Sequence, residues 1–191
     1  MADEPDPAIV YLAMGADVYL ALGADVYLAL GANLGDRRRN IDDAIARLDA
    51  AGVAIAARSP LYETDAVSAE PQPPYLNAVV RASTALPPEA LLALCLDIER
   101  QLGRVRPPGR DKASRTLDID VLLYGARIID TPALTVPHPA MLVRAFVRIP
   151  LADVAAPGLR HPVSGDALDR CAPSPQVSLF DVRRLRDPDG A

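Results

Sequence analysis

The stretch Arg115-Thr-Leu-Asp-Ile-Asp-Val-Leu-Leu-Tyr-Gly125 is the last of six predicted helices and strands, and it decides the predicted fold. Its apolar residues alternate with Asp118 and Asp120, and this period of two predicts a β-strand. Side chains two positions apart project from the same face of a strand, so the two carboxylates are expected to lie side by side. Gly125 ends the strand.

Five further elements precede this strand. From the N-terminus we expect a strand over residues 26–35, a helix that follows the N-cap Asp36 and stops at Gly52, a strand from Val53 to near Tyr62, a strand from Leu76 to Ser83 and a helix from Pro88 to Gly103. The order is β-α-β-β-α-β, which is typical of a ferredoxin-like fold. We therefore predict an α+β protein, a two-layer α/β sandwich with a mainly antiparallel sheet and helices on one face.

The remainder of the chain is less regular. Residues 127–160 contain five prolines between short segments, and a short helix is expected from Ala140 to Val147. From about Cys171 onward the sequence has the composition of a polar tail. A length of 191 residues, half of them apolar, corresponds to a single domain with some tail and a core of Ala, Leu, Val and Ile.

A tandem repeat occupies residues 10–33, which read VYLAMGAD, VYLALGAD and VYLALGAN. Asp17 and Asp25 interrupt the apolar run, so a membrane span is not expected. Each copy has the pattern of a short buried strand that ends in a glycine turn. Only the third copy continues directly into the domain, and we interpret it as the native strand. The two earlier copies are surplus; they could pair as extra strands, compete for the same position in the sheet or stay loose.

Composition excludes several classes of protein. The net charge of −5 argues against nucleic-acid binding. The two cysteines, Cys95 and Cys171, are too few for a disulfide framework and lack the spacing of a zinc site, so a reducing cytoplasm is the expected location. The acidic start of the chain lacks the positive leader of a secretory signal. Cys95 falls on the apolar side of the second helix and is interpreted as a core residue.

Asp118 and Asp120 have the chemistry of a magnesium site. Neighbouring carboxylates repel each other unless a cation neutralises them, and Mg²⁺ prefers such oxygen ligands together with water and phosphate oxygens. The alternative is a strand that shows its acids to solvent. Five basic residues lie just before the strand: Arg104, Arg106, Arg110, Lys112 and Arg115. Arginines bind phosphate oxygens in a bidentate manner. A basic run can also be a solvated surface, but beside metal-binding acids it indicates phosphoryl chemistry. The Gly-x-x-x-x-Gly-Lys-Ser/Thr phosphate loop of P-loop kinases does not occur.

The sequence Arg115–Gly125 resembles the characteristic motif of the 6-hydroxymethyl-7,8-dihydropterin pyrophosphokinase family. Members of this family transfer pyrophosphate from ATP to a pterin alcohol in folate biosynthesis. Supporting matches occur in order over residues 26–165: Leu28–Gly35, Tyr75-Leu-Asn77, Glu99, Gly103–Arg106, Leu134–His138, Arg144–Phe146 and Pro150-Leu151. Many members carry a tryptophan in the loop before the motif, whereas this chain has none.

The resemblance implies a role for individual residues. Asp118 and Asp120 would hold two Mg²⁺ ions and act catalytically together with Arg104 and Arg115. The positions that surround ATP in the family match Glu99, Arg104, Arg106, Arg115, Val121, Thr135, His138 and Arg144. The positions of the pterin pocket match Thr64, Tyr75, Asn77 and Phe146. The implied division of the chain is a surplus repeated segment over 1–25, a pyrophosphokinase domain over 26–168 and a C-terminal tail over 169–191.

The resemblance also sets the expected partners. These are the small molecules ATP and 6-hydroxymethyl-7,8-dihydropterin, with no nucleic acid and no membrane, and the protein is expected to be a cytoplasmic monomer. The alternative is a non-catalytic ligand-binding module with a ferredoxin-like fold, because a fold alone does not determine a function.

Overall fold

The computed structural model describes residues 23–66, 71–104 and 114–170, and the backbone of residues 183–184. In chain order the elements are β1 (Ala24–Ala32), α3 (Arg37–Ala50), β2 (Val53–Arg58), β3 (Tyr62–Thr64), β4 (Tyr75–Thr84), α4 (Pro88–Gln101), β5 (Asp118–Tyr124), β6 (Ile129–Asp130), β7 (Thr135–Val136), α5 (Ala145–Val154) and β8 (Arg183–Arg184). The first copy of the repeat and residues 18–22 of the second copy lie outside the described residues, and so does most of the tail that was predicted from Cys171.

The main sheet is antiparallel, with the strand order β5-β1-β4-β3-β8, and β2 also pairs with β4. The third copy of the repeat belongs to β1, as predicted, but the strand begins at Ala24 in the second copy and ends at Ala32 rather than at Gly35. This strand lies between β4 and β5. The predicted order β-α-β-β-α-β is present from β1 to β5, and the ferredoxin-like α+β fold is confirmed. One predicted strand is divided, because Pro60 separates β2 from the short strand β3.

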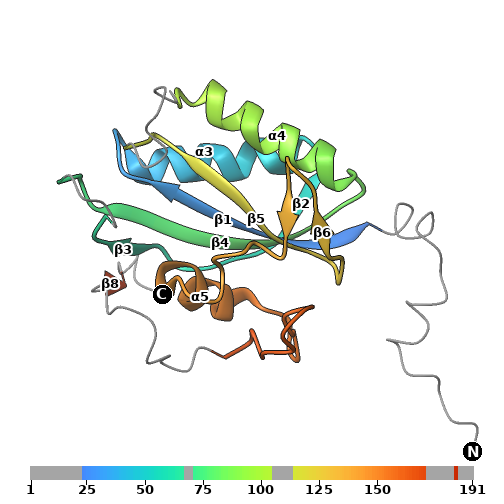
Figure 1. The fold of residues 1–191 in the computed structure, drawn as a ribbon. Helices are drawn as coiled ribbons and strands as arrows, with labels where there is room; N and C mark the ends of the chain where they lie inside the picture. The colour runs from blue at the N-terminus through green and yellow to red at the C-terminus, as the bar shows by residue number, and fades with distance from the viewer. Residues whose placement is uncertain (1–22, 67–70, 105–113, 171–182, 185–191) are drawn as a thin grey trace, which may run out of the picture.

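Helices α3 and α4 cover one face of the sheet (Figure 1). The side chain of Asp36 caps α3 by accepting a hydrogen bond from the backbone N–H of Arg39 at 3.0 Å. Pro88 occupies the first turn of α4, where a missing N–H costs nothing. The apolar sides of both helices, which include Cys95, pack on alternate residues of β1, β4 and β5 and form the larger core.

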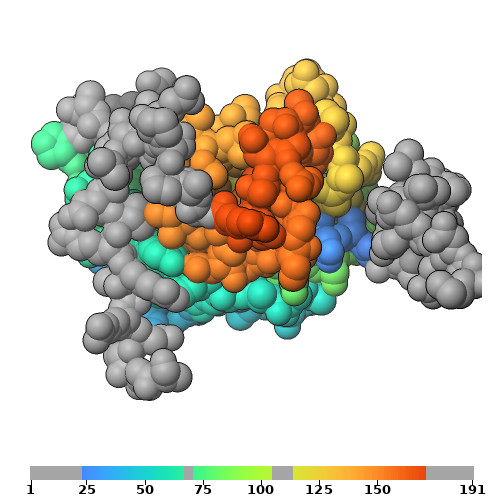
Figure 2. Space-filling view, turned by 90° about the horizontal axis from the view of Figure 1, so that it is seen from below, coloured from blue at the N-terminus to red at the C-terminus, as the bar shows by residue number. Residues whose placement is uncertain are grey.

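A third helix, α5, covers the opposite face of the sheet, so the prediction that helices lie on one face is incomplete (Figure 1). Figure 2 shows this face, with α5 and the segment that follows it in orange to red. The expected helix over 140–147 is wrong in its bounds, because α5 begins at Ala145 and contains Pro150. A helix covers this second face because β1, β4 and β5 carry apolar residues there. Tyr27, Val79 and Leu122 are buried on this face and pack with α5 in a separate core.

Part of the predicted C-terminal tail pairs with the main sheet. Arg183 and Arg184 form the two-residue strand β8, which pairs with β3. None of the helices within the described ranges is long and apolar enough to cross a membrane.

Candidate active site

Four strand ends meet at one edge of the main sheet. Because β1 runs antiparallel to β4 and β5, and β3 runs antiparallel to β4, the ends of β1 and β3 lie beside the starts of β4 and β5. The starts of β4 and β5 carry Tyr75, Asn77, Asp118 and Asp120, and the end of β3 carries Thr64. Topology therefore brings together residues that the sequence places up to 56 positions apart.

Small residues on β1 lie between the polar side chains. In the register of the sheet, Gly31 is directly opposite both Asp118 and Asn77, while Ala29 is opposite Asp120. Residues directly opposite each other project from the same face. A Cβ atom added at Gly31 would lie 3.3 Å from the Oδ1 atom of Asn77. Gly31 and Ala29 thus form a low floor between the carboxylates on β5 and the amide on β4.

Asp118 is held by two arginines. One of its carboxylate oxygens accepts a hydrogen bond from Arg104 and the other accepts one from Arg115. Arg104 also forms an ion pair with Glu99 at 2.5 Å, and the side chain of Glu99 is only 2% exposed. Glu99 in turn accepts a hydrogen bond from the backbone N–H of Ile119 at 2.8 Å. This network fixes the end of α4 to the start of β5, and it explains why a glutamate is buried there.

The electrostatics of Arg115 follow from the same arrangement. Burial alone would lower its pKa, but the attraction of Asp118 and Tyr75 outweighs burial, so the pKa of Arg115 is raised. Arg115 therefore stays positively charged under all ordinary conditions. Two guanidinium groups next to one carboxylate leave further donors for an anionic ligand.

Asp120 differs from its neighbour, since its carboxylate has no hydrogen bond or ion pair with any residue in the described part of the chain. Burial and the nearby negative charge of Asp118 raise the pKa of Asp120, whereas His138 and Arg144 act in the opposite direction. Two acids on one face, one of them without a partner, are a donor set that suits a hard divalent cation.

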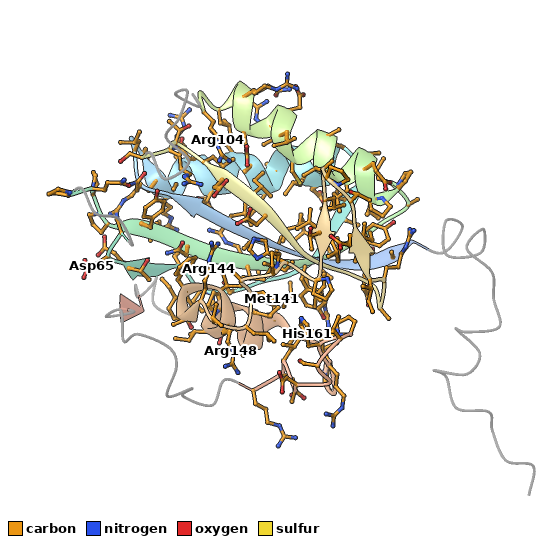
Figure 3. The ribbon with its side chains drawn as sticks, viewed as in Figure 1. Asp65, Arg104, Met141, Arg144, Arg148 and His161 are labelled. Atoms are coloured by element: carbon orange, nitrogen blue, oxygen red, sulfur yellow. The ribbon has the colours of Figure 1, made fainter. Side chains whose placement is uncertain are left out.

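His138 and Arg144 lie close enough to the carboxylate of Asp120 to act on its charge. The backbone N–H of His138 donates to the carbonyl of Leu122 at 3.0 Å, and its Nδ1 atom accepts from the N–H of Ala140. Burial lowers the pKa of His138, although Asp120 opposes this shift. Figure 3 shows Arg144 at the start of α5 and Arg104 on the side of α4, so cationic side chains approach from both layers.

The amide of Asn77 and the hydroxyl of Thr64 form a buried pair. The Nδ2 atom of Asn77 donates to the Oγ1 atom of Thr64 at 2.9 Å, and both side chains are nearly inaccessible to solvent. This bond orients the amide, and it leaves the second N–H and the carbonyl oxygen for other partners. Phe146 lies at the start of α5, with its ring centre 5.7 Å from the guanidinium carbon of Arg144.

Asn33 was not among the predicted site residues, yet it connects both flanks of the site. Its Oδ1 atom accepts a hydrogen bond from the backbone N–H of Arg115 at 2.7 Å. Its Nδ2 atom donates to Ser114 at 3.2 Å, to the carbonyl of Pro73 at 3.3 Å and to Gln72 at 3.4 Å. The signal in the sequence is a buried asparagine that directly follows an apolar strand, a position that needs several hydrogen-bond partners.

Two of the predicted residues, Val121 and Thr135, have a weaker connection to this cluster. Val121 is 4% exposed and its side chain belongs to the core beneath α3 and α4, so only its backbone is available to a ligand. The side chain of Thr135 is exposed on β7, a short strand close to β5. Arg106 lies outside the described residues.

Comparison with known proteins gives a consistent result. A family model described as 7,8-dihydro-6-hydroxymethylpterin-pyrophosphokinase matches residues 27–156. The 2-amino-4-hydroxy-6-hydroxymethyldihydropteridine pyrophosphokinase of Pseudomonas aeruginosa is 44% identical over 133 residues, which cover 68% of this chain and 79% of that protein. The enzyme of the same name from Bacillus subtilis is 43% identical over 123 residues, which cover 64% of this chain and 72% of that protein.

Longer relatives contain the same domain as one part. The folic acid synthesis protein fol1 of Pneumocystis carinii is 42% identical over 133 residues, but this chain spans only 18% of its length. Among solved structures, wild-type HPPK-DHPS of Plasmodium falciparum superposes with a TM-score of 0.56 at 14% identity, over 77% of this chain and 44% of that chain. This likeness bears on the fold alone and agrees with the ferredoxin-like architecture. The family resemblance carried by the Arg115–Gly125 motif is confirmed, and the chain belongs to the 7,8-dihydro-6-hydroxymethylpterin-pyrophosphokinase family.

Proposed function

We propose that this chain transfers pyrophosphate from ATP to 6-hydroxymethyl-7,8-dihydropterin and releases AMP, as a step of folate biosynthesis. The hydroxymethyl oxygen bonds to the β-phosphorus of ATP as the bond between that phosphorus and the α–β bridging oxygen breaks. AMP leaves with the bridging oxygen, and the hydroxyl proton passes to water. No covalent intermediate with the protein is required.

The observation that supports this proposal best is the row formed by Asp118, Gly31 and Asn77 across three strands. A flat, hydrogen-bonding ligand held by the amide of Asn77 would lie over the floor of β1. Its reactive group would then be close to the carboxylates at the start of β5.

The charged residues divide into two groups by their positions. We assign Arg104, Arg115, His138 and Arg144 to the phosphates of ATP, because they surround the carboxylates and stay outside the Asn77–Thr64 pair. Glu99 positions Arg104 and the start of β5. Transfer of a phosphoryl group depends mainly on alignment and on neutralisation of charge, and this arrangement supplies both.

Asp118 and Asp120 are assigned to Mg²⁺, and we expect two ions. The carboxylate of Asp120 supports this assignment because no described residue forms a hydrogen bond or ion pair with it. The raised pKa of Asp120, caused by burial and by Asp118, supports it as well. Bound Mg²⁺ would neutralise the phosphate oxygens of the nucleotide. Because Asp118 is already paired with two arginines, these guanidinium groups would have to turn toward the phosphates when the metal binds.

Several further assignments are part of the proposal. Thr135, Val121 and Arg106 are assigned to the nucleotide, and Tyr75 and Phe146 to the faces of the pterin ring. The catalytic domain is proposed to span residues 26–168, between the repeated segment 1–25 and the tail 169–191. We propose a monomeric, cytoplasmic protein.

The test is AMP release from ATP and Mg²⁺, measured with and without 6-hydroxymethyl-7,8-dihydropterin. We expect AMP only when the pterin is present. Asp118→Asn and Asp120→Asn should each lower kcat by about a thousandfold, because each removes a charge that acts in the transition state. Asp130→Asn is the matched control, since Asp130 is an exposed acid on β6 and should leave kcat unchanged.

The same measurement separates the alternative function. A non-catalytic binding module would bind ATP or the pterin in calorimetry and release no AMP. Full activity of the Asp120→Asn variant would refute the assignment of the metal site even if the reaction itself takes place.

A further inference from the structure

The nine residues of β1 occur twice in this chain without a single difference. Residues 16–24 read ADVYLALGA, and residues 24–32, which form β1, read ADVYLALGA. Within the main sheet, β1 pairs with β4 along its whole length and with β5 along most of it. Both neighbouring strands would therefore meet the same side chains if residues 16–24 occupied the position of β1.

A shift of eight residues also preserves which face each side chain occupies. Side chains alternate along a strand, so an even shift leaves the apolar set on the same face, whereas a shift by one residue would reverse it. The glycine requirements are met as well. Gly23 has a positive φ of 76° and Gly31 leaves space for Asn77; in the shifted register these positions are filled by Gly15 and Gly23.

The residue that follows the strand is what distinguishes the two copies. Asn33 follows β1, and Asp25 follows the earlier copy. Asn33 accepts a hydrogen bond from Arg115 and donates hydrogen bonds to Ser114, to the carbonyl of Pro73 and to Gln72. An aspartate could accept from the N–H of Arg115, but its carboxylate has no hydrogen to donate. One amide group thus favours the described register.

We propose that this chain has a second register of its central strand, in which residues 16–24 replace residues 24–32 between β4 and β5. The connection to α3 then lengthens from residues 33–36 to residues 25–36. Closing a loop three times as long disfavours this register by about fivefold on entropic grounds alone. The lost donor bonds of Asn33 disfavour it further, so the second register is the minor one.

The shifted register would loosen one flank of the candidate active site. In the described register the backbone N–H groups of Asn33 and Leu34 donate to the carbonyl of Arg115 at 3.0 and 3.2 Å. After the shift the backbone N–H groups of Asp25 and Val26 could replace these two bonds, but the bonds that the Asn33 amide donates to Ser114 and to the carbonyl of Pro73 would have no counterpart. The repeat therefore acts as an internal competitor that shifts molecules between two registers in which the segment before β5 is held differently.

The first test is a disulfide that can form only in the shifted register. Asp25 is directly opposite Ser83 in the described sheet, so Asp17 would be opposite Ser83 after the shift. Opposed residues in antiparallel strands have Cα atoms close enough for a disulfide. In a Cys171→Ser background at equilibrium with glutathione, Asp17→Cys with Ser83→Cys should give a minor intramolecular cross-link. Asp25→Cys with Ser83→Cys is the reference for the described register.

The matched control is Val18→Cys with Ser83→Cys. Val18 is adjacent to Asp17 in the chain, but in the shifted register its side chain would point to the other face of the sheet. Random collisions would cross-link both pairs equally, and this result would overturn the proposal. Cross-linked dimers in place of a cross-linked monomer would overturn it too, as would the absence of any cross-link at Asp17.

The second test changes the balance between the registers at Asp25, an exposed residue remote from the site. Asp25→Asn gives the earlier copy the amide that Asn33 supplies, so the cross-linked fraction should rise about fivefold, the equivalent of one net hydrogen bond. Leu20→Pro blocks the shifted strand and should return the cross-linked fraction of Asp25→Asn to the level of the Val18→Cys control. A cross-linked fraction that does not respond to Asp25→Asn, or that persists with Leu20→Pro, would refute the mechanism.

Discussion

The hydroxyl of Thr64 has one structural task that can be isolated, because it accepts the hydrogen bond that orients Asn77. Thr64→Val keeps the shape of the side chain and removes the acceptor, which leaves a buried N–H of Asn77 without a partner. We expect the free energy of unfolding in urea to fall by about 1–3 kcal/mol. Since the amide also loses its orientation, KM for the pterin should rise while KM for ATP stays the same. An unchanged KM for the pterin would contradict the assignment of Asn77.

Cys95 illustrates a residue whose chemistry is suppressed by its surroundings. Burial raises the pKa of its thiol to about 12, and the negative charges of Glu99 and Asp120 add to this effect. At pH 8 only about one molecule in ten thousand would carry the reactive thiolate. In a Cys171→Ser variant, iodoacetamide should therefore leave the native protein unlabelled and label it fully in denaturant. Rapid labelling of the native variant would mean that α4 opens readily.

At this scale the sequence predicted the charged residues better than the ones that hold them. The spacing of Asp118 and Asp120 correctly predicted that they share one face of a strand, while their role stays a prediction. The network of Glu99, Arg104 and Asp118 could not be derived from a local pattern, since Arg104, just beyond α4, contacts Asp118, which lies 14 positions later on β5. Such contacts depend on how the helix is docked, and no local pattern reports that.

Strand β1 provides the floor of the site through the absence of a side chain at Gly31. Gly31→Ala would place a methyl group 3.3 Å from the Oδ1 atom of Asn77 and displace the amide by a few tenths of an ångström. We expect KM for the pterin to rise by about tenfold, with KM for ATP as the internal control. Calorimetric titration with the pterin alone should show the same loss. Equal changes for both substrates would indicate a general distortion of β1.

Among the elements, those with strong periodicity were predicted well. Helices α3 and α4 and strands β1, β4 and β5 each show one dominant period and clear end signals, so their existence and approximate bounds followed from the sequence. Helix α5 was misplaced because its apolar stripe is interrupted by Pro150, which normally indicates a break. The separation of β2 from β3 was missed because the predicted strand was continued from the alternation at Val53, Ile55 and Ala57 across Pro60 to Tyr62.

The two cores share one sheet, and this sets the cooperativity of the whole molecule. Leu48 on α3 packs in the larger core, and Leu151 on α5 packs in the smaller one. Both side chains are at most 1% exposed, so Leu48→Ala and Leu151→Ala should each lower the free energy of unfolding by about 2–5 kcal/mol. Because β1, β4 and β5 contribute to both cores, each variant should still unfold in a single transition by circular dichroism and calorimetry. Separate transitions in Leu151→Ala would show that α5 is an independent unit.

The order of elements predicted the architecture, but it did not predict what covers the second face. A β-α-β-β-α-β chain accounts for the two helices on one side, and nothing in that order requires a third. The buried residues Tyr27, Val79 and Leu122 do require one, because a sheet with two apolar faces needs two layers of cover. That requirement becomes visible only when the register shows which residues share a face.

The central position of β1 has a consequence for the way the protein is made. This strand is the first of the described domain to be synthesised, yet its two partners are residues 75–84 and 118–124. At ordinary translation speeds, roughly 5–20 seconds pass before the last of these partners emerges. Until β4 emerges both edges of this apolar strand are unpaired, and until β5 emerges one edge remains so, a condition that favours association with other nascent chains. Synthesis is therefore a stage at which this chain is exposed to aggregation through its central strand.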